Sequence, residues 1–89
     1  MITSIDSFKS TQIRSLTRVP AGDQAVVVAI NTEQELQGRL MGMGLFVGTK
    51  VDILQGGEGK LGPLLLGIGN TRIALGRDIA STILAEEAK

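Results

Sequence analysis

The stretch Thr32–Leu45, TEQELQGRLMGMGL, contains a short helix together with the signals that start and end it. Thr32 and Glu35 fit the S/T-x-x-E capping box, in which each side chain satisfies a backbone N–H at the helix start. Three apolar residues recur at the spacing of one helix face: Leu36, Leu40 and Met43. The sequence therefore predicts a helix over residues 33–43 that buries one side.

The residues after this helix turn the chain into a strand. Gly44 lies where a helix commonly ends with a residue of positive φ, after which Leu45 can fold back onto the helix. Gly48 permits a further turn, and Lys50–Gln55 alternates between apolar and polar side chains as a strand does. A short helix between strands is typical of an insertion in a β fold.

Outward from this segment, turn residues divide the chain into short apolar runs. The predicted strands are five, at 24–30, 50–55, 64–68, 71–75 and 82–85, with a short helical turn near 76–80. Five short strands leave little room for two stacked sheets and close most economically into a small barrel. We predict an SH3-like barrel and not an OB-fold, which would have longer strands and display aromatic or basic residues to bases.

The 89 residues are enough for one domain with a small core. Its boundaries are predicted from composition: a loosely attached N-terminal extension at 1–14, the barrel at 15–86 and a charged tail at 87–89. The hydrophobic content of 43% is almost entirely aliphatic, because there are two Phe and no Trp or Tyr. An aliphatic core is expected.

The composition also limits the chemistry. The absence of Cys and His removes disulfides, thiolate ligands and the commonest general base. Nine basic and nine acidic residues balance, and no stripe of one sign indicates a nucleic-acid or membrane surface. No apolar run is long enough for a membrane span or a signal peptide. We expect a soluble cytoplasmic protein without enzyme activity or cofactor and without direct membrane insertion.

Three further features of the sequence do not indicate a specific functional site. Gly56–Gly62, GGEGKLG, does not end in Gly-Lys-Ser/Thr and leads into a strand, so we interpret it as a mobile hairpin loop and not as a phosphate cradle. The carboxylates that could hold a metal are scattered along the chain, and we assign no metal site. Gly38, inside the predicted helix, indicates close approach of a strand.

One ordered set of residues runs from Leu16 to Ala85: Leu16, Gly22, the Val-rich segment 24–30, Arg39-Leu40, Met43-Gly44-Leu45, Gly48, Val51, Gly62-Pro63, Ile73-Ala74-Leu75, Asp78-Ile79-Ala80 and Ile83. This order resembles the FeoA family, the small cytoplasmic ferrous iron transport protein A. The resemblance implies an SH3-like barrel and action alongside FeoB, the membrane protein with a cytoplasmic GTPase domain. Two features depart from the family pattern: Val47 stands where a Pro is frequent, and the N-terminal extension has no counterpart in shorter members.

The predicted function is that of a cytoplasmic accessory protein, peripheral to the inner membrane through its partner, which binds the FeoB-type GTPase transporter and modulates its activity or assembly. The alternative is a regulatory domain that works with an iron-dependent transcription regulator. We predict a contact patch formed by Met41 and Phe46, which point away from the core on a helical wheel, with Arg39 and Lys50 at its rim. Leu65, in a strand that is apolar on both faces, is the candidate for a second partner surface or for homo-oligomer formation.

Overall fold

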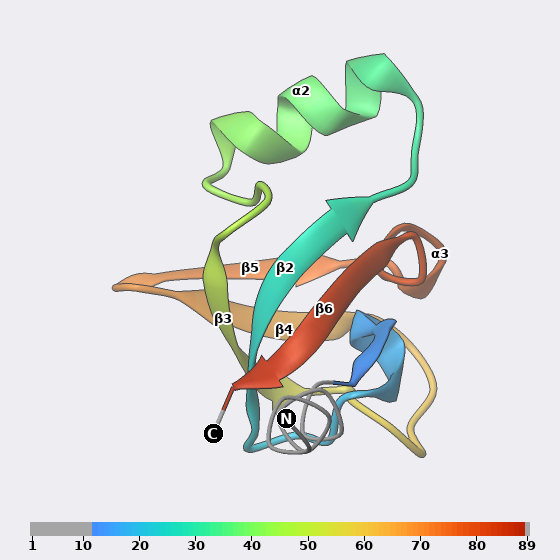
Figure 1. Ribbon diagram of the computed structural model, residues 1–89. Coiled ribbons are helices and arrows are strands. Elements are labelled where there is room, and N and C mark those ends of the chain that lie inside the picture. Colours follow the sequence, from blue (N-terminus) through green and yellow to red (C-terminus); the bar gives the residue numbers. More distant parts are fainter. Residues whose placement is uncertain (1–11, 89) are drawn as a thin grey trace, which may run out of the picture.

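Six antiparallel strands form one strongly curved sheet in the computed structural model, which describes residues 12–88 (Figure 1). The strand order is β1-β6-β2-β3-β4-β5. The elements are β1 (Ile13–Ser15), the 3-10 turn η1 (Leu16–Arg18), β2 (Gln24–Ile30), α2 (Gln34–Gly42), β3 (Lys50–Gln55), β4 (Leu64–Ile68), β5 (Thr71–Leu75), α3 (Arg77–Ala80) and β6 (Ile83–Ala88). This mainly β architecture confirms the predicted fold class.

The alternating segments of the sequence are the strands of the structure. The observed bounds of β2, β3, β4 and β5 coincide with those predicted, and α2 and α3 lie within the predicted helical segments. In β3, Val51 and Ile53 face the core, as do Leu64 and Leu66 in the neighbouring β4. The period of two in the sequence therefore located these strands correctly.

The structure has one strand more than the five located from the sequence. β1 lies partly within the segment that the sequence analysis treated as an N-terminal extension, and it pairs with β6 at the edge of the sheet. β6 itself continues through Glu86 and Glu87, which were expected in or next to the charged tail. Pairing with β2 on one side and β1 on the other satisfies the backbone of β6, and this outweighs the weak strand preference of Glu.

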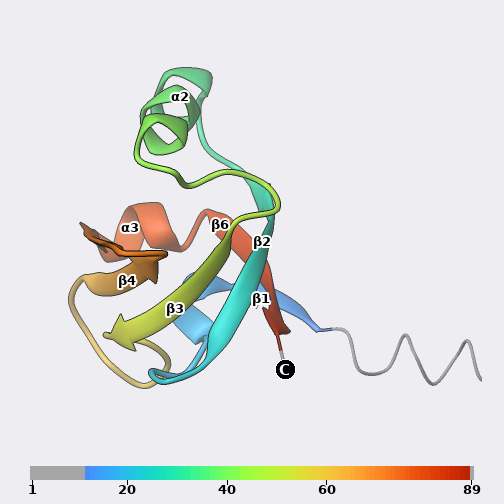
Figure 2. The same cartoon turned by 90° about the vertical axis from the view of Figure 1, so that its left-hand side faces the viewer.

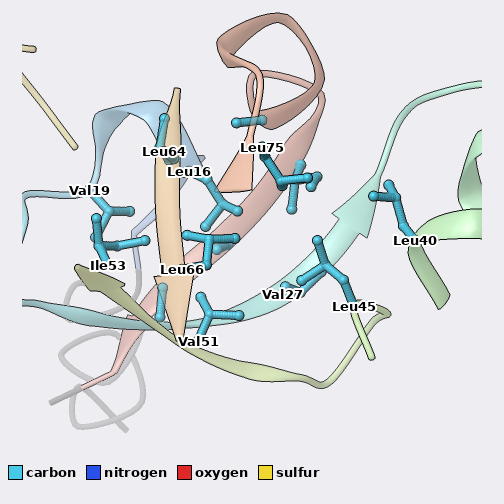
Figure 3. Packing of buried hydrophobic residues seen from close by; sticks show 14 residues of the cluster. Leu16, Val19, Val27, Leu40, Leu45, Val51, Ile53, Leu64, Leu66 and Leu75 are labelled. Atoms are coloured by element: carbon cyan, nitrogen blue, oxygen red, sulfur yellow. The ribbon is translucent and has the colours of Figure 1, made fainter. Parts of the chain in front are cut away.

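The core is aliphatic, as expected from the composition (Figure 3). Its buried side chains are Leu16, Val19, Ala25, Val27, Leu40, Leu45, Val51, Ile53, Leu64, Leu66, Leu75, Ala80, Ile83 and Ala85. All but Leu40 and Leu45 come from the sheet, η1 and its flank, or α3. Leu40 and Leu45 extend the cluster toward α2, so the helix is attached to the barrel through a narrow contact.

The start of α2 differs from the predicted capping box. Its N-cap is Glu33, which makes no side-chain capping bond, and the Thr32–Glu35 pair does not form the box. Instead the Nε2 amide of Gln37 donates to the carbonyl oxygens of Ile30, at 3.1 Å, and Thr32, at 2.8 Å. Gln37 thus fastens the first turns of the helix to the end of β2.

The end of α2 follows the prediction. Gly44 has a φ of 93° and donates its N–H to the carbonyl of Met41, and Leu45 donates to the carbonyl of Leu40, both at 2.9 Å. These two bonds form a Schellman motif. Leu45 folds back and is fully buried, whereas Met43, predicted as core, is 41% exposed. Because Leu45 supplies the apolar contact under the helix end, Met43 is left outside.

The glycine-rich loop Gly56–Gly62 is anchored by specific contacts, in contrast to the mobile loop that was predicted. A Cβ on Gly57 would lie 2.2 Å from the carbonyl oxygen of Val19, so only glycine fits there. The N–H of Glu58 donates to the same carbonyl at 3.0 Å, and the Arg77 guanidinium donates to the carbonyl oxygens of Gly62, at 2.9 Å, and Gly56. These glycines serve close packing of backbones.

Candidate functional site

An apolar groove lies between α2 and the segment that leads into β3. Its volume is about 450 Å³, and its walls are formed by Ile30, Gln37, Met41, Leu45, Phe46 and Val47. No charged residue is among them. Ile30 and Leu45 belong to the core cluster or pack against it, whereas Met41, Phe46 and Val47 are 60%, 45% and 61% exposed. The groove thus joins the core to a set of apolar side chains that face solvent.

The helix forms one wall of the groove. α2 stands clear of the sheet, connected by a segment at each end (Figure 2). Gln37 and Met41 lie one turn apart on the same side of this helix, and both line the groove. Leu36 and Leu40 point toward the barrel, Leu36 partly buried and Leu40 fully. The narrow buried face of α2 therefore leaves the adjacent face, with Met41, free to form a groove.

Thr49 holds the opposite wall in place. Its side chain is 8% exposed, and its Oγ1 donates to the carbonyl of Gly44 at 3.0 Å and accepts the Phe46 N–H at 3.2 Å. The Phe46 carbonyl accepts the Thr49 N–H at 3.0 Å, and Gly48, with a φ of 98°, donates to the carbonyl of Val27 at 2.8 Å. These bonds fix a tight turn that projects Phe46 and Val47 outward.

Of the five residues predicted for partner contact, two line the groove and three lie outside it. Met41 and Phe46 share the groove, although they come from the helix and the following turn. Arg39 is exposed in α2, but residues two positions apart on a helix do not face the same way, so it leaves the helix away from Met41. Lys50 is exposed at the first position of β3, opposite Val26. Leu65 is half-buried in β4, opposite Ala74, and does not line the groove.

Several groove residues were not singled out from the sequence. Val47 was noted only as a departure from a family pattern, and Ile30, Gln37 and Thr49 were not assigned to a site. Ile30 reaches the groove because β2 carries a register shift between Val27 and Ala29, where the simple alternation of the strand is interrupted. A threonine beside a turn glycine was the one local signal for Thr49.

The described part of the chain offers no arrangement typical of a metal site. Within residues 12–88, no three Asp or Glu side chains come together in a way that could hold an ion. Among the same residues, no buried side-chain polar atom lacks a hydrogen-bond partner. None of the helices in this part of the chain has the length and apolar character needed to cross a bilayer.

Comparison with known families gives this geometry a context. A family model described as the FeoA domain matches residues 14–87. The chain belongs to the FeoA family. This confirms the resemblance that the sequence indicated. A curated relative named as an Fe(2+) transport protein A, from Methanocaldococcus jannaschii, is 28% identical over 68 residues, which are 76% of this chain and 79% of that protein.

Solved structures agree on the fold. The crystal structure of an iron uptake regulatory protein, FeoA, superimposes with a TM-score of 0.76 at 25% identity and covers 86% of this chain and 100% of its own. FeoA of Stenotrophomonas maltophilia, complexed with zinc and described as a prokaryotic SH3 domain protein, has a TM-score of 0.65 at 27% identity and covers 80% of this chain and 87% of its own. The SH3-like prediction is confirmed.

A manganese-dependent transcriptional repressor shares the fold as well. It has a TM-score of 0.76 at 18% identity and covers 88% of this chain but 43% of its own. At this identity the likeness concerns the fold alone. The FeoA relatives, in contrast, are named for transport or uptake of iron, which places this chain in a family of ferrous iron transport.

Proposed function

We propose that this chain is a cytoplasmic accessory protein of ferrous iron uptake, which binds the cytoplasmic region of an FeoB-type membrane GTPase transporter and modulates its activity or assembly. The observation that carries the proposal is the apolar groove of α2 and the Phe46 turn, on a chain of the FeoA family. The groove is the docking site. The chain performs no chemistry of its own, and any GTP hydrolysis belongs to the partner.

The lining of the groove suits a protein partner. Met and aromatic residues are enriched at the centres of protein interfaces, and charged residues are depleted there. The groove has this composition, with Met41 and Phe46 on facing walls and no charge between them. Covering their exposed apolar surface contributes about 25 cal/mol per Å². A partner that inserts one or two apolar side chains would gain most of its binding energy at this point.

The turn that carries Phe46 is ordered before any partner arrives. Thr49 and Gly48 hold it with hydrogen bonds to Gly44, Phe46 and Val27. A side chain that is already positioned loses little conformational freedom on association, so more of the contact energy appears as affinity. Phe46 is therefore the expected hot spot of the interface.

Arg39 and Lys50 lie outside the groove, and we propose that they contact the partner beyond it, Arg39 from the side of α2 that faces away from Met41. Charges at the edge of an interface act mainly on the rate of encounter and are screened by salt. The contribution of these two charges to the affinity should therefore fall as the ionic strength rises, whereas the contribution of Phe46 should stay the same. Neither residue is required for the groove to form.

The test is the Phe46→Ser variant, measured for binding to the cytoplasmic GTPase domain of the transporter by calorimetry. We expect the affinity to fall at least about tenfold, since a loss of roughly 1.4 kcal/mol has this effect. The melting temperature should fall only slightly, because Phe46 is 45% exposed. Leu61→Ser is the matched control: Leu61 is 93% exposed and is not part of the groove lining, so its variant should bind as the wild type does.

Two outcomes would contradict the proposal. If both variants bound equally well, the groove would not be the docking site. If the unchanged chain did not bind the GTPase domain but shifted the DNA complex of an iron-dependent regulator in a gel, the transcriptional alternative would replace the transporter.

A further inference from the structure

The sulfur atoms of this chain are confined to methionine. The sequence has three Met and lacks Cys, His, Trp and Tyr. Met41 and Met43 belong to the described residues, and their side chains are 60% and 41% exposed. Thioethers and thiolates are the protein groups that peroxides oxidise most readily, and exposure favours the reaction. In this chain, peroxide therefore has only methionine thioethers as ready targets.

The two exposed methionines occupy different surroundings. Met41 lines the apolar groove together with Phe46 and Val47. Met43 is the C-cap of α2 and does not line the groove. Residues two positions apart at a helix end point in different directions, so a change at Met43 leaves the groove unaltered.

We propose that Met41 is a site of reversible oxidation by hydrogen peroxide, and that its sulfoxide weakens docking at the groove. The inference rests on the proposed function. In the reaction the thioether sulfur attacks one peroxide oxygen, the O–O bond breaks, and a sulfur–oxygen bond forms. Sulfur is oxidised by two electrons while peroxide is reduced to water. Methionine sulfoxide reductases reverse the change at the expense of a thiol reductant.

The side chains of the groove offer no free hydrogen-bond donor to the new oxygen when a partner covers it. A sulfoxide is polar and accepts hydrogen bonds, whereas the thioether is apolar. The side-chain amide of Gln37, the one polar side chain in the lining, already donates to the carbonyls of Ile30 and Thr32. The Phe46 N–H is bonded to Thr49. The sulfoxide oxygen would therefore exchange water for an apolar surrounding without a free side-chain donor, which costs enough to weaken binding about tenfold or more.

The direction of the effect suits iron uptake. Fe²⁺ reduces peroxide to more reactive oxygen species, so incoming iron is most harmful when peroxide is present. A docking surface that loses affinity in peroxide would release the accessory protein from the transporter under these conditions. Reduction of the sulfoxide would restore docking.

The experiment uses the full chain and the cytoplasmic GTPase domain of the transporter. The chain is treated with hydrogen peroxide, sulfoxide positions are mapped by mass spectrometry of peptides, and the dissociation constant is measured before and after treatment. Met41→Leu and Met43→Leu are treated in parallel, since Leu conserves the volume of Met and lacks sulfur. The readout for each protein is the ratio of its two dissociation constants, so a changed starting affinity of a variant does not affect the comparison.

We expect a ratio of about ten or more for the wild type and for Met43→Leu, and a ratio within about twofold for Met41→Leu. Incubation with a methionine sulfoxide reductase and dithiothreitol should return the wild-type ratio to one. The inference is overturned if Met41→Leu loses affinity as much as the wild type, or if the wild type binds unchanged with Met41 oxidised. Failure of the untreated wild type to bind is a separate result, which refutes the proposed function and this inference with it.

Discussion

Two glycine-rich segments of similar appearance in the sequence have opposite roles in the molecule. In Met41–Gly48 the glycines turn the backbone, and Gly44 and Gly48 take positive φ with room around them, which lets Phe46 and Val47 face solvent. In Gly56–Gly62 the first two glycines lie against the backbones of Val19 and Pro63. Met41–Gly48 therefore presents side chains to solvent, whereas the start of Gly56–Gly62 packs its bare backbone against other backbone segments. The role of a glycine is determined by the atoms around it, and not by the number of glycines in its segment.

The largest effect is expected from Gly57→Ala, which would break the inward-packed segment. Its Cβ would meet the Val19 carbonyl oxygen at 2.2 Å and the Ala21 nitrogen at 2.7 Å, and both are backbone atoms. The loop or the η1 flank would have to move. We expect a loss of about 3 kcal/mol or more in the free energy of unfolding, measured by urea denaturation.

Gly38→Ala is the matched control for this prediction. Gly38 lies inside α2, and an added Cβ would have no neighbour within 4 Å, so the close strand approach inferred from the sequence is wrong. The variant should be more stable by about 0.5–1 kcal/mol, because Ala is the better helix former. Equal effects of the two substitutions would show that the Gly56–Gly62 packing is unimportant.

An intermediate effect on stability and affinity is expected from Thr49→Val, because Thr49 holds the turn of Met41–Gly48 that carries Phe46. Val keeps the shape but removes the hydroxyl that bonds the Gly44 carbonyl and the Phe46 N–H. We expect a loss of about 1–2 kcal/mol of stability and a severalfold loss of partner affinity, since the Phe46 turn is no longer held. Thr49→Ser retains the hydroxyl and should recover most of both. Full affinity of the Val variant would mean that the turn does not depend on this side chain.

The smallest effect concerns a surface outside both segments. Leu65 lies half-buried in β4, with the 37% exposed Leu54 on the neighbouring β3. We predict weak self-association through this face, which Leu65→Glu should abolish in light scattering while the circular dichroism spectrum stays the same. Leu61→Glu is the control for an added charge at an exposed leucine. An unaltered mass of the Leu65 variant would leave the residue without a role in assembly.

Local sequence patterns correctly predicted the elements that have a periodic sequence or their own stop signal. β2 and β3 were predicted from alternation, and the end of α2 from the Gly44 stop signal. β1 and the second half of β6 were missed because their stability comes from pairing with residues distant in the sequence. Periodicity within a segment cannot reveal a partner elsewhere in the chain.

The candidate site, like the fold, was predicted only in part. The outward direction of Met41 and Phe46 followed from helix geometry, and both are exposed in the structure. The other lining residues were not predicted: Ile30 enters through an irregularity in β2, and the side chain of Gln37, one turn before Met41, makes bonds to the end of β2 in place of the expected capping box. Such features depend on the assembled molecule.

The most direct test of the proposed docking site is a titration of the ¹⁵N-labelled chain with the cytoplasmic GTPase domain, followed by the amide resonances of both glycine-rich segments. We predict shift changes or line broadening at Met41, Phe46 and Val47, and none at Gly57 or Lys60. Changes confined to Gly56–Gly62, or a spectrum unaltered by the GTPase domain, would contradict the assignment of the groove as the docking surface.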